Sequence, residues 1–181
     1  MPVNIAWGIT GAGDKLNQTF DVMDGLSRNK EIQITAVISK AGKEVLRRYK
    51  LTERLTSITE KIFIEKDANT PFIVGPIQSG KYDYLIIAPA TANTVAKLVH
   101  GIADTLLTNC VSMAAKAGRE VCILPVDRKR GTITTTLPDG SPFQLTMRDI
   151  DVNNTERLRS MFGITVIDSP EEIREFISGQ I

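Results

Sequence analysis

Apolar and polar residues follow one another along the chain in blocks that predict strands and helices in turn. Apolar runs rich in β-branched residues predict buried strands over 3–9, 32–38, 62–65, 82–88, 120–124 and 164–167. Apolar residues at helical spacing, such as Leu16, Phe20 and Met23, predict helices over 14–29 and 102–117. Further helices are expected from about residues 42, 93 and 170, and Asp14 is expected to cap the first helix. Such alternation is typical of a parallel sheet with helices on both faces.

One segment departs from this pattern. Thr132–Leu137 and Phe143–Met147 flank Pro138-Asp139-Gly140, a turn sequence typical of β-hairpins. We therefore expect one domain over 1–181 of the α/β class: a three-layer, doubly wound parallel sheet, Rossmann-like or flavodoxin-like, with a β-hairpin insertion at about 131–148. The hairpin would serve as a lid or in assembly.

Composition narrows the range of partners. The chain has 22 basic and 21 acidic residues and only 6% aromatics, which gives no reason to expect nucleic acid. No apolar stretch approaches the roughly 20 residues that cross a bilayer, and no targeting segment precedes the first strand, so a cytoplasmic protein is expected. Two cysteines, Cys110 and Cys122, fall on predicted core elements. They indicate buried thiols in a reduced compartment, with no metal site.

Candidate chemistry lies where the strands end, because open parallel sheets bind ligands beyond the carboxyl ends of their strands. The first strand runs into Gly8-Ile9-Thr10-Gly11-Ala12-Gly13, where the backbone can approach an anion at a helix start, unless this is only a tight turn. After the second strand, Ser39 either donates to a phosphate or caps a helix.

The third strand end is the most specific. In Pro89-Ala90-Thr91-Ala92-Asn93-Thr94, small residues admit a flat ring, and the polar side chains offer donors and acceptors. The helix that follows supplies positive potential for a ring that becomes anionic on reduction. The fourth end carries Arg128-Lys129-Arg130, which either meets a cofactor phosphate or an acidic substrate or is a solvated loop.

The spacing also excludes two nucleotide sites. The first loop is Gly-x-x-Gly-x-Gly rather than Gly-x-Gly-x-x-Gly, and the second strand ends in Ser39-Lys40 rather than in an acidic residue, which argues against NAD. No Gly-Lys-Ser/Thr follows the glycines, which argues against a nucleotide-hydrolysing P-loop.

At these residues the chain resembles the flavoprotein family of the FMN-dependent cysteine decarboxylases and flavin prenyltransferases. The glycine loop, Ile38-Ser39-Lys40-Ala41, Pro89–Thr94 and Gly101–Leu107 match in order and cover roughly residues 3–127. The opening Trp7–Gly13 and the tail that holds Arg148-Asp149 and Asn153-Asn154 look most like the archaeal-type branch, which includes ferredoxin-linked electron carriers and acceptor-dependent dihydromethanopterin reductases.

The resemblance implies FMN as the cofactor and a homo-oligomer, a trimer or a trimer-based assembly. It implies FMN contacts from residues of the four strand ends and the loop beside them: Thr10, Gly11, Ala12, Gly13, Ser39, Thr91, Ala92, Asn93, Thr94, Asp104 and, more loosely, Arg128.

Two departures from the family narrow the activity. The decarboxylases use a histidine between the second strand and the strand at 82–88, whereas this chain has only His100, which follows the helix from Asn93 and is expected to be a helix-end residue. The glutamate and tyrosine set of the prenyltransferases has no counterpart in 125–181.

We therefore expect an FMN-dependent oxidoreductase that passes electrons from a low-potential donor such as ferredoxin to a pterin-like substrate. The hairpin, Arg128–Arg130 and Arg148 are the candidates for substrate or donor contact. Three alternatives stay open: an electron carrier without its own organic substrate, a decarboxylase with other acid/base residues, and a non-redox flavin-binding module.

Overall fold

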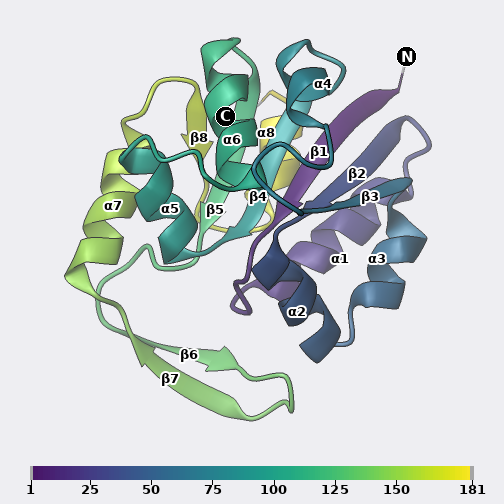
Figure 1. The fold of residues 1–181 in the computed structure, drawn as a ribbon. Helices are drawn as coiled ribbons and strands as arrows, with labels where there is room; N and C mark the ends of the chain where they lie inside the picture. The colour runs from purple at the N-terminus through teal and green to yellow at the C-terminus, as the bar shows by residue number, and fades with distance from the viewer. Residues whose placement is uncertain (1, 180–181) are drawn as a thin grey trace.

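The computed structural model describes residues 2–179 as a parallel sheet between two layers of helices (Figure 1). All neighbouring strands of the sheet run parallel, in the order β3-β2-β1-β4-β5-β8. The strands are β1 (Val3–Ile9), β2 (Ile32–Ile38), β3 (Lys61–Ile64), β4 (Tyr84–Ala90), β5 (Glu120–Pro125) and β8 (Ile164–Val166). The expected doubly wound α/β fold is confirmed.

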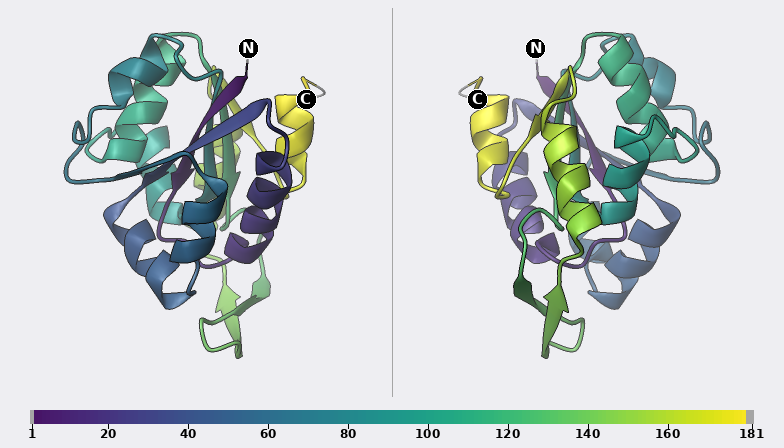
Figure 2. Two further views of the ribbon diagram at one scale, coloured as in Figure 1. Left: turned by 90° about the vertical axis from the view of Figure 1, so that its right-hand side faces the viewer. Right: turned by 90° about the vertical axis from the view of Figure 1, so that its left-hand side faces the viewer.

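The strands are apolar because both faces of the sheet are covered. Ile5, Trp7 and Ile9 of β1 point to one core, whereas Ala6 points to the other, as the two-residue period of a strand requires. Figure 2 shows the two helical layers on opposite faces of the sheet. One layer holds α1 (Leu16–Ser27), α3 (Thr52–Ile58) and α8 (Glu172–Ile177); the other holds α4 (Val74–Gln78), α5 (Ala92–Val99) and α6 (Leu106–Lys116).

The strand order reverses at the centre of the sheet. The chain winds from β1 outward to β2 and β3, then returns to place β4 on the other side of β1. Loops that leave β1 and β4 at their carboxyl ends therefore diverge, and a crevice forms at such a switch point. The helix α2 (Lys40–Arg48) begins beside this crevice.

Two further elements complete the fold, and the first of them adds Leu158 to the core beneath α5 and α6. The helix α7 (Asp149–Arg159) packs against α5. The hairpin of β6 (Thr132–Thr136) and β7 (Pro142–Thr146) projects beyond the carboxyl edge of the sheet, at the bottom of Figure 1.

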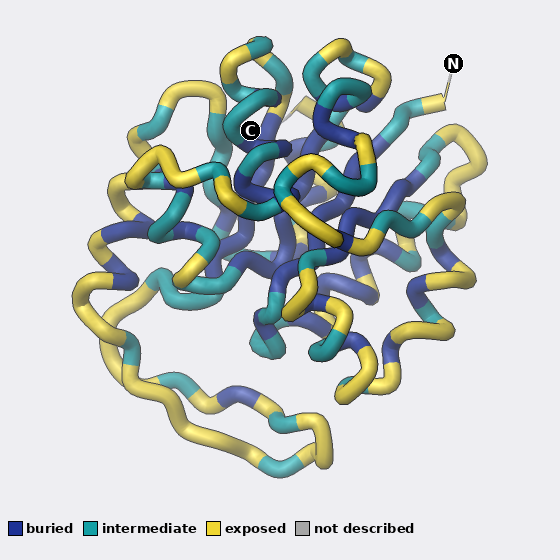
Figure 3. The backbone as a smooth tube through the Cα atoms, viewed as in Figure 1, coloured by how far each residue is buried: buried dark blue, intermediate teal, exposed yellow. Residues whose placement is uncertain are grey.

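The hairpin insertion is confirmed, and it is tied to the domain at two points. The Tyr49 hydroxyl donates to Thr136 O at 2.8 Å, and the Thr135 hydroxyl donates to Asp14 Oδ1 at 3.2 Å. All five residues of β7 are exposed, as the largely yellow hairpin of Figure 3 shows.

The structure corrects the expected start of the first helix. Asp14 does not cap α1; the capping position is Lys15, which has φ 61° and makes no capping hydrogen bond with its side chain. Its neighbour Asp14 instead accepts the hydrogen bond from Thr135, which is remote in sequence. Among residues 2–179, none of the helices combines the length and the apolar content that a bilayer crossing requires.

Candidate functional site

A cleft of about 530 Å³ opens at the carboxyl edge of the sheet, where the starts of α2, α5 and α6 meet the end of β1. Seven of the residues expected to bind the cofactor line it: Thr10, Gly11, Ser39, Thr91, Asn93, Thr94 and Asp104. Four others, Ala12, Gly13, Ala92 and Arg128, are not among its lining residues. Three of the four predicted strand ends thus converge on one cavity, and the fourth does not.

Buried hydrogen bonds join the ends of β1 and β4. The Thr10 hydroxyl donates to Pro89 O at 2.6 Å and accepts from the backbone N–H of Thr91 at 3.1 Å. Three residues earlier, within β1, the fully buried Trp7 donates its indole N–H to Ala88 O at 3.0 Å. The turn that leads into α5 is therefore fixed to β1, although the two segments are about eighty residues apart in sequence.

Glycines on both sides allow the first loop to pack closely against α2. A Cβ on Gly11 would lie 2.8 Å from the Cβ of Ala41, and a Cβ on Gly42 would collide with the carbonyl of Ile9. Because neither residue carries a side chain, the start of α2 packs against the loop backbone. Ser39 is thereby placed beside the glycine loop.

Three helix starts face the cleft, and each is capped by a hydroxyl. Ser39 accepts from Gly42 N at 2.9 Å, Thr91 from Thr94 N at 3.2 Å, and Thr105 from Thr108 N at 3.3 Å. Ser39 is therefore a helix cap, and as an acceptor it keeps its own hydroxyl proton for a further partner. Helix starts favour anions, and here one backbone N–H of each start already binds a carboxylate: Glu65 at α2 and α6, and Asp127 at α5.

Glu65 is a buried cleft residue that the sequence analysis missed. It directly follows β3, is only 9% exposed, and accepts hydrogen bonds from Lys40 N at 2.9 Å and from Leu106 N at 2.8 Å. One carboxylate thus joins the starts of α2 and α6. The short strand predicted at 62–65 was the only signal for it, since a charged residue at a strand end falls at the binding edge of the sheet.

The outer rim of the cleft carries one ion pair and one free amide. Lys97 Nζ lies 2.7 Å from Asp104 Oδ1, and this hydrogen bond lowers the pKa of the Asp104 carboxyl. The side chain of Asn93 is exposed in the cleft and makes no hydrogen bond to any residue of 2–179. Its amide can therefore both donate to and accept from a ligand.

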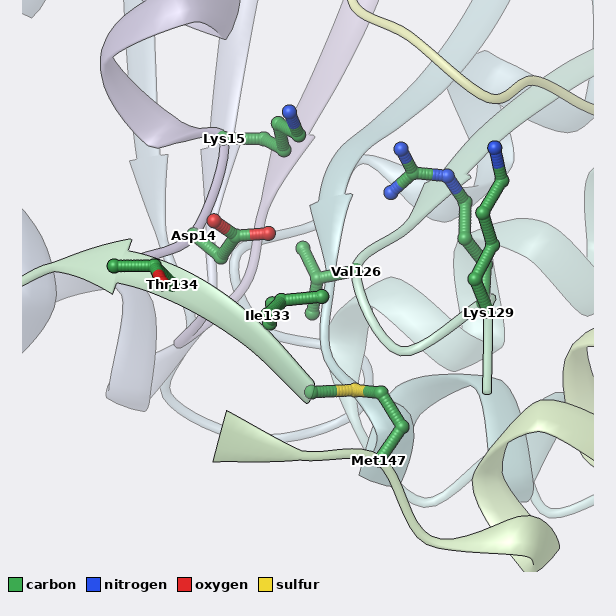
Figure 4. Close-up of a pocket in the computed structure, with 8 residues that line it drawn as sticks. Asp14, Lys15, Val126, Lys129, Ile133, Thr134 and Met147 are labelled. Atoms are coloured by element: carbon green, nitrogen blue, oxygen red, sulfur yellow. The ribbon is translucent and has the colours of Figure 1, made fainter. Parts of the chain in front are cut away.

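Neither Arg128 nor Asp127 is among the residues that line the cleft. Arg128 lines a smaller pocket beneath the hairpin, shown in Figure 4, together with Lys15 and Lys129. Burial raises the pKa of the Asp127 carboxyl, and the nearby Asp151 raises it further, against the lowering effect of the Ala92 N–H.

His100 lies at the wrong end of α5 to act in the cleft. Its Nδ1 is 2.8 Å from Ala96 O at the carboxyl end of the helix, whereas the cleft is at the amino end, roughly 12 Å away along an eight-residue helix. The interpretation of His100 as a helix-end residue is confirmed.

Comparisons with known proteins point in one direction. The model of the Flavoprotein family matches residues 1–180. An uncharacterized protein of Methanocaldococcus jannaschii is 48% identical over 175 residues, covering 97% of this chain and 94% of the relative. Dihydromethanopterin reductase (acceptor) of the same organism is 32% identical over 237 aligned positions, covering 97% of this chain and 96% of the relative.

Among solved structures, Burkholderia xenovorans DmrB in complex with FMN, described as a cubic protein cage for redox transfer, has a TM-score of 0.83. It is 29% identical, and the match covers 98% of this chain and 94% of DmrB.

Proposed function

The chain belongs to the Flavoprotein family, and on that premise we propose that it binds FMN in the cleft at the ends of β1, β2 and β4 and acts as an FMN-dependent oxidoreductase. The resemblance to flavoproteins found in the sequence is thereby confirmed. The observation that carries the proposal is the convergence of the Thr10, Ser39 and Thr91 strand ends on one cavity, in a chain that superposes closely on an FMN-bound protein.

The residues present fit this cofactor. A volume of about 530 Å³ falls within the roughly 300–1,000 Å³ usual for such ligands. The Ser39 hydroxyl would meet the phosphate, because it accepts from Gly42 N and keeps its own proton to donate. Thr91, Asn93 and Thr94 would meet the polar edge of the ring, and Leu107 supplies apolar contact.

When bound, FMN supplies one- or two-electron transfer, while the protein supplies position and field. Thr91, Asn93 and Thr94 lie at the start of α5, where the helix dipole would favour negative charge, although the Ala92 N–H already binds the Asp127 carboxylate. Glu65 holds the starts of α2 and α6 at a fixed separation, since each of its oxygens accepts one backbone N–H. No histidine lines the cleft within residues 2–179, so its walls offer no imidazole for decarboxylation.

The proposed acceptor is a pterin-like substrate, because relatives at about 32% identity are dihydromethanopterin reductases. The alignment with the M. jannaschii reductase runs over 237 positions, so that enzyme has inserted segments that this chain of 181 residues lacks. We propose a separate low-potential donor such as ferredoxin to recharge the flavin. A homo-oligomer is supported by the cage described for DmrB.

The test uses purified protein loaded with FMN and reduced by a low-potential donor. We expect a yellow protein whose reduced flavin is reoxidised rapidly by dihydromethanopterin or a close pterin analogue, measured by stopped-flow absorbance. Reoxidation by one-electron acceptors without pterin reduction would instead indicate an electron carrier. A protein that stays colourless with added FMN would refute the proposal.

A further inference from the structure

A groove of about 510 Å³ lies between α2, α3 and the edge strand β3. The strand order places β3 at one edge of the sheet, and Figure 1 shows α2 and α3 on that side of the molecule. The groove adjoins the cofactor cleft, because Lys40 lines both and Ile64 of the groove directly precedes Glu65 of the cleft. Nothing in the proposed flavin chemistry uses this groove.

The floor of the groove is apolar. Aliphatic side chains of α2, α3, β2 and β3 form it: Ile38, Leu46, Leu55, Ile62 and Ile64. Ile38, Leu46 and Leu55 are buried in the core, whereas Ile64 is 39% exposed at the end of the edge strand. Exposed apolar surface that is ringed by polar side chains is typical of a site of protein contact.

The rim of the groove is cationic. Lys40, Lys43 and Arg47 occupy exposed positions of α2, and Glu44 is the single carboxylate among the described residues that line the groove. Glu44 is already paired, because its Oε1 lies 2.7 Å from Arg47 Nη2 and 2.8 Å from Arg48 Nε. Lys43 forms no ion pair with a carboxylate of residues 2–179. The helix α2 therefore presents a net positive charge to solvent beside the apolar floor.

We propose that this groove docks the electron donor, a small protein with an acidic surface around an apolar contact. The proposal rests on the proposed reductase function, which requires a separate donor. Opposite charges on two partners speed their encounter and fix their orientation, and the contacts of electron-transfer proteins are small and transient. A donor bound at Lys40 and Ile64 would lie directly beside the cleft.

The electrons balance with a one-electron donor. Two donor molecules, each oxidised by one electron in turn, would supply the two electrons that one hydride transfer to the acceptor removes, and the protons come from water. Because the oxidised donor must leave before the next one binds, a contact held mainly by surface charge suits this exchange better than a large apolar interface.

The experiment titrates a bacterial two-cluster ferredoxin of net negative charge into protein incubated with FMN, by calorimetry at low ionic strength, where surface charges are least screened. Both proteins are oxidised, so that binding is measured without electron transfer. We expect binding that weakens as salt is added. The double variant Lys43→Gln/Arg47→Gln should bind roughly tenfold more weakly, because each rim charge contributes modestly.

Two further variants separate charge from apolar contact. The control Lys30→Gln/Lys81→Gln removes the same charge from exposed positions before the amino ends of β2 and β4, and it should bind ferredoxin as the unaltered protein does. Ile64→Gln should weaken binding without changing its dependence on salt, because no charge is altered. Flavin content should stay constant in all three variants, since none of the replaced residues lines the cleft.

Unaltered protein that binds no ferredoxin, or equal loss in both double variants, would overturn the proposal. If Ile64→Gln instead dissociated the protein's own assembly in sedimentation and left ferredoxin binding unchanged, the groove would belong to a second copy of the chain and the proposal would be wrong. The flavin assignment fails separately. A protein that stays colourless but binds ferredoxin through α2 would refute that assignment alone, whereas a yellow, pterin-reducing protein insensitive to Lys43 and Arg47 would refute only the docking site.

Discussion

Replacing Glu65 with glutamine tests whether one buried carboxylate holds the cleft in shape. The two oxygens of Glu65 accept from Lys40 N at 2.9 Å and Leu106 N at 2.8 Å. Glutamine keeps the volume but has a single acceptor oxygen, so its amide N–H₂ must face one of the two backbone N–H groups. One charge-assisted hydrogen bond is lost, and one backbone donor is left unpaired in a region that is only 9% exposed.

Together these losses should lower the free energy of unfolding by about 2–4 kcal/mol. Urea unfolding of the FMN-free protein, followed by circular dichroism, measures this difference, and the exposed Glu60→Gln serves as control for the loss of one negative charge. FMN should also bind roughly tenfold more weakly, equivalent to about 1.4 kcal/mol, because the starts of α2 and α6 are no longer joined. If the free energies of unfolding of Glu65→Gln and of the control agreed within about 0.5 kcal/mol, the two hydrogen bonds of Glu65 would not stabilise the cleft.

Three further variants examine other parts of the site. Thr10→Val removes the hydroxyl that joins β1 to the turn before α5, leaves two buried backbone groups unpaired and should cost about 2–3 kcal/mol in urea unfolding; an unchanged midpoint would contradict this. Asn93→Ala should lower FMN occupancy, measured by absorbance after gel filtration, without changing stability, since its side chain has no partner within residues 2–179; constant flavin content would argue against a ring at this position. Asp127→Asn should be more stable than wild type near pH 7, because the raised pKa of Asp127 means that the folded state disfavours its charged carboxylate. This difference in the free energy of unfolding should shrink as the pH falls through that pKa, since the wild-type carboxyl then takes up a proton. A difference independent of pH would exclude Asp127 as its source.

The strands could be predicted because they are buried on both faces and therefore read as apolar runs. β1 and β2 have the predicted bounds, whereas β4 ends two residues later than predicted. The prediction ended at Ala88 because proline cannot donate to a ladder. In the structure the ladder between β4 and β5 is irregular between Ile87 and Ala90, which accommodates Pro89 within the strand.

The helices α3, α4 and α7 were not predicted, and α7 shows why. Besides Val152 and Leu158 it buries the polar residues Asp151, Asn154 and Thr155, so its inner face shows too few apolar residues to predict a helix from the sequence. The helices α1 and α6 also begin later than predicted, at Leu16 and Leu106. In α6 the capping hydroxyl is Thr105, which the apolar spacing of residues 102–117 did not indicate.

Much of the cleft could be predicted because parallel strands bring their carboxyl ends to one edge. Seven of the expected residues line it, and Glu65 was missed because its role depends on Leu106, forty-one residues further along the chain. Arg128 was placed with the cofactor residues because of the family resemblance, and in the structure it lines the separate pocket beneath the hairpin. Strand order alone does not decide on which side of the edge a side chain lies.

The position of Trp7 gives the molecule a built-in optical probe. It is the only tryptophan of the chain and is fully buried. Its indole N–H is hydrogen-bonded to Ala88 O, just before the turn that leads to the cleft. An isoalloxazine nearby would take up the excitation energy of this indole, so ultraviolet-excited emission should fall as the cofactor loads. Occupancy can therefore be followed in unlabelled protein, one chromophore reporting on the other.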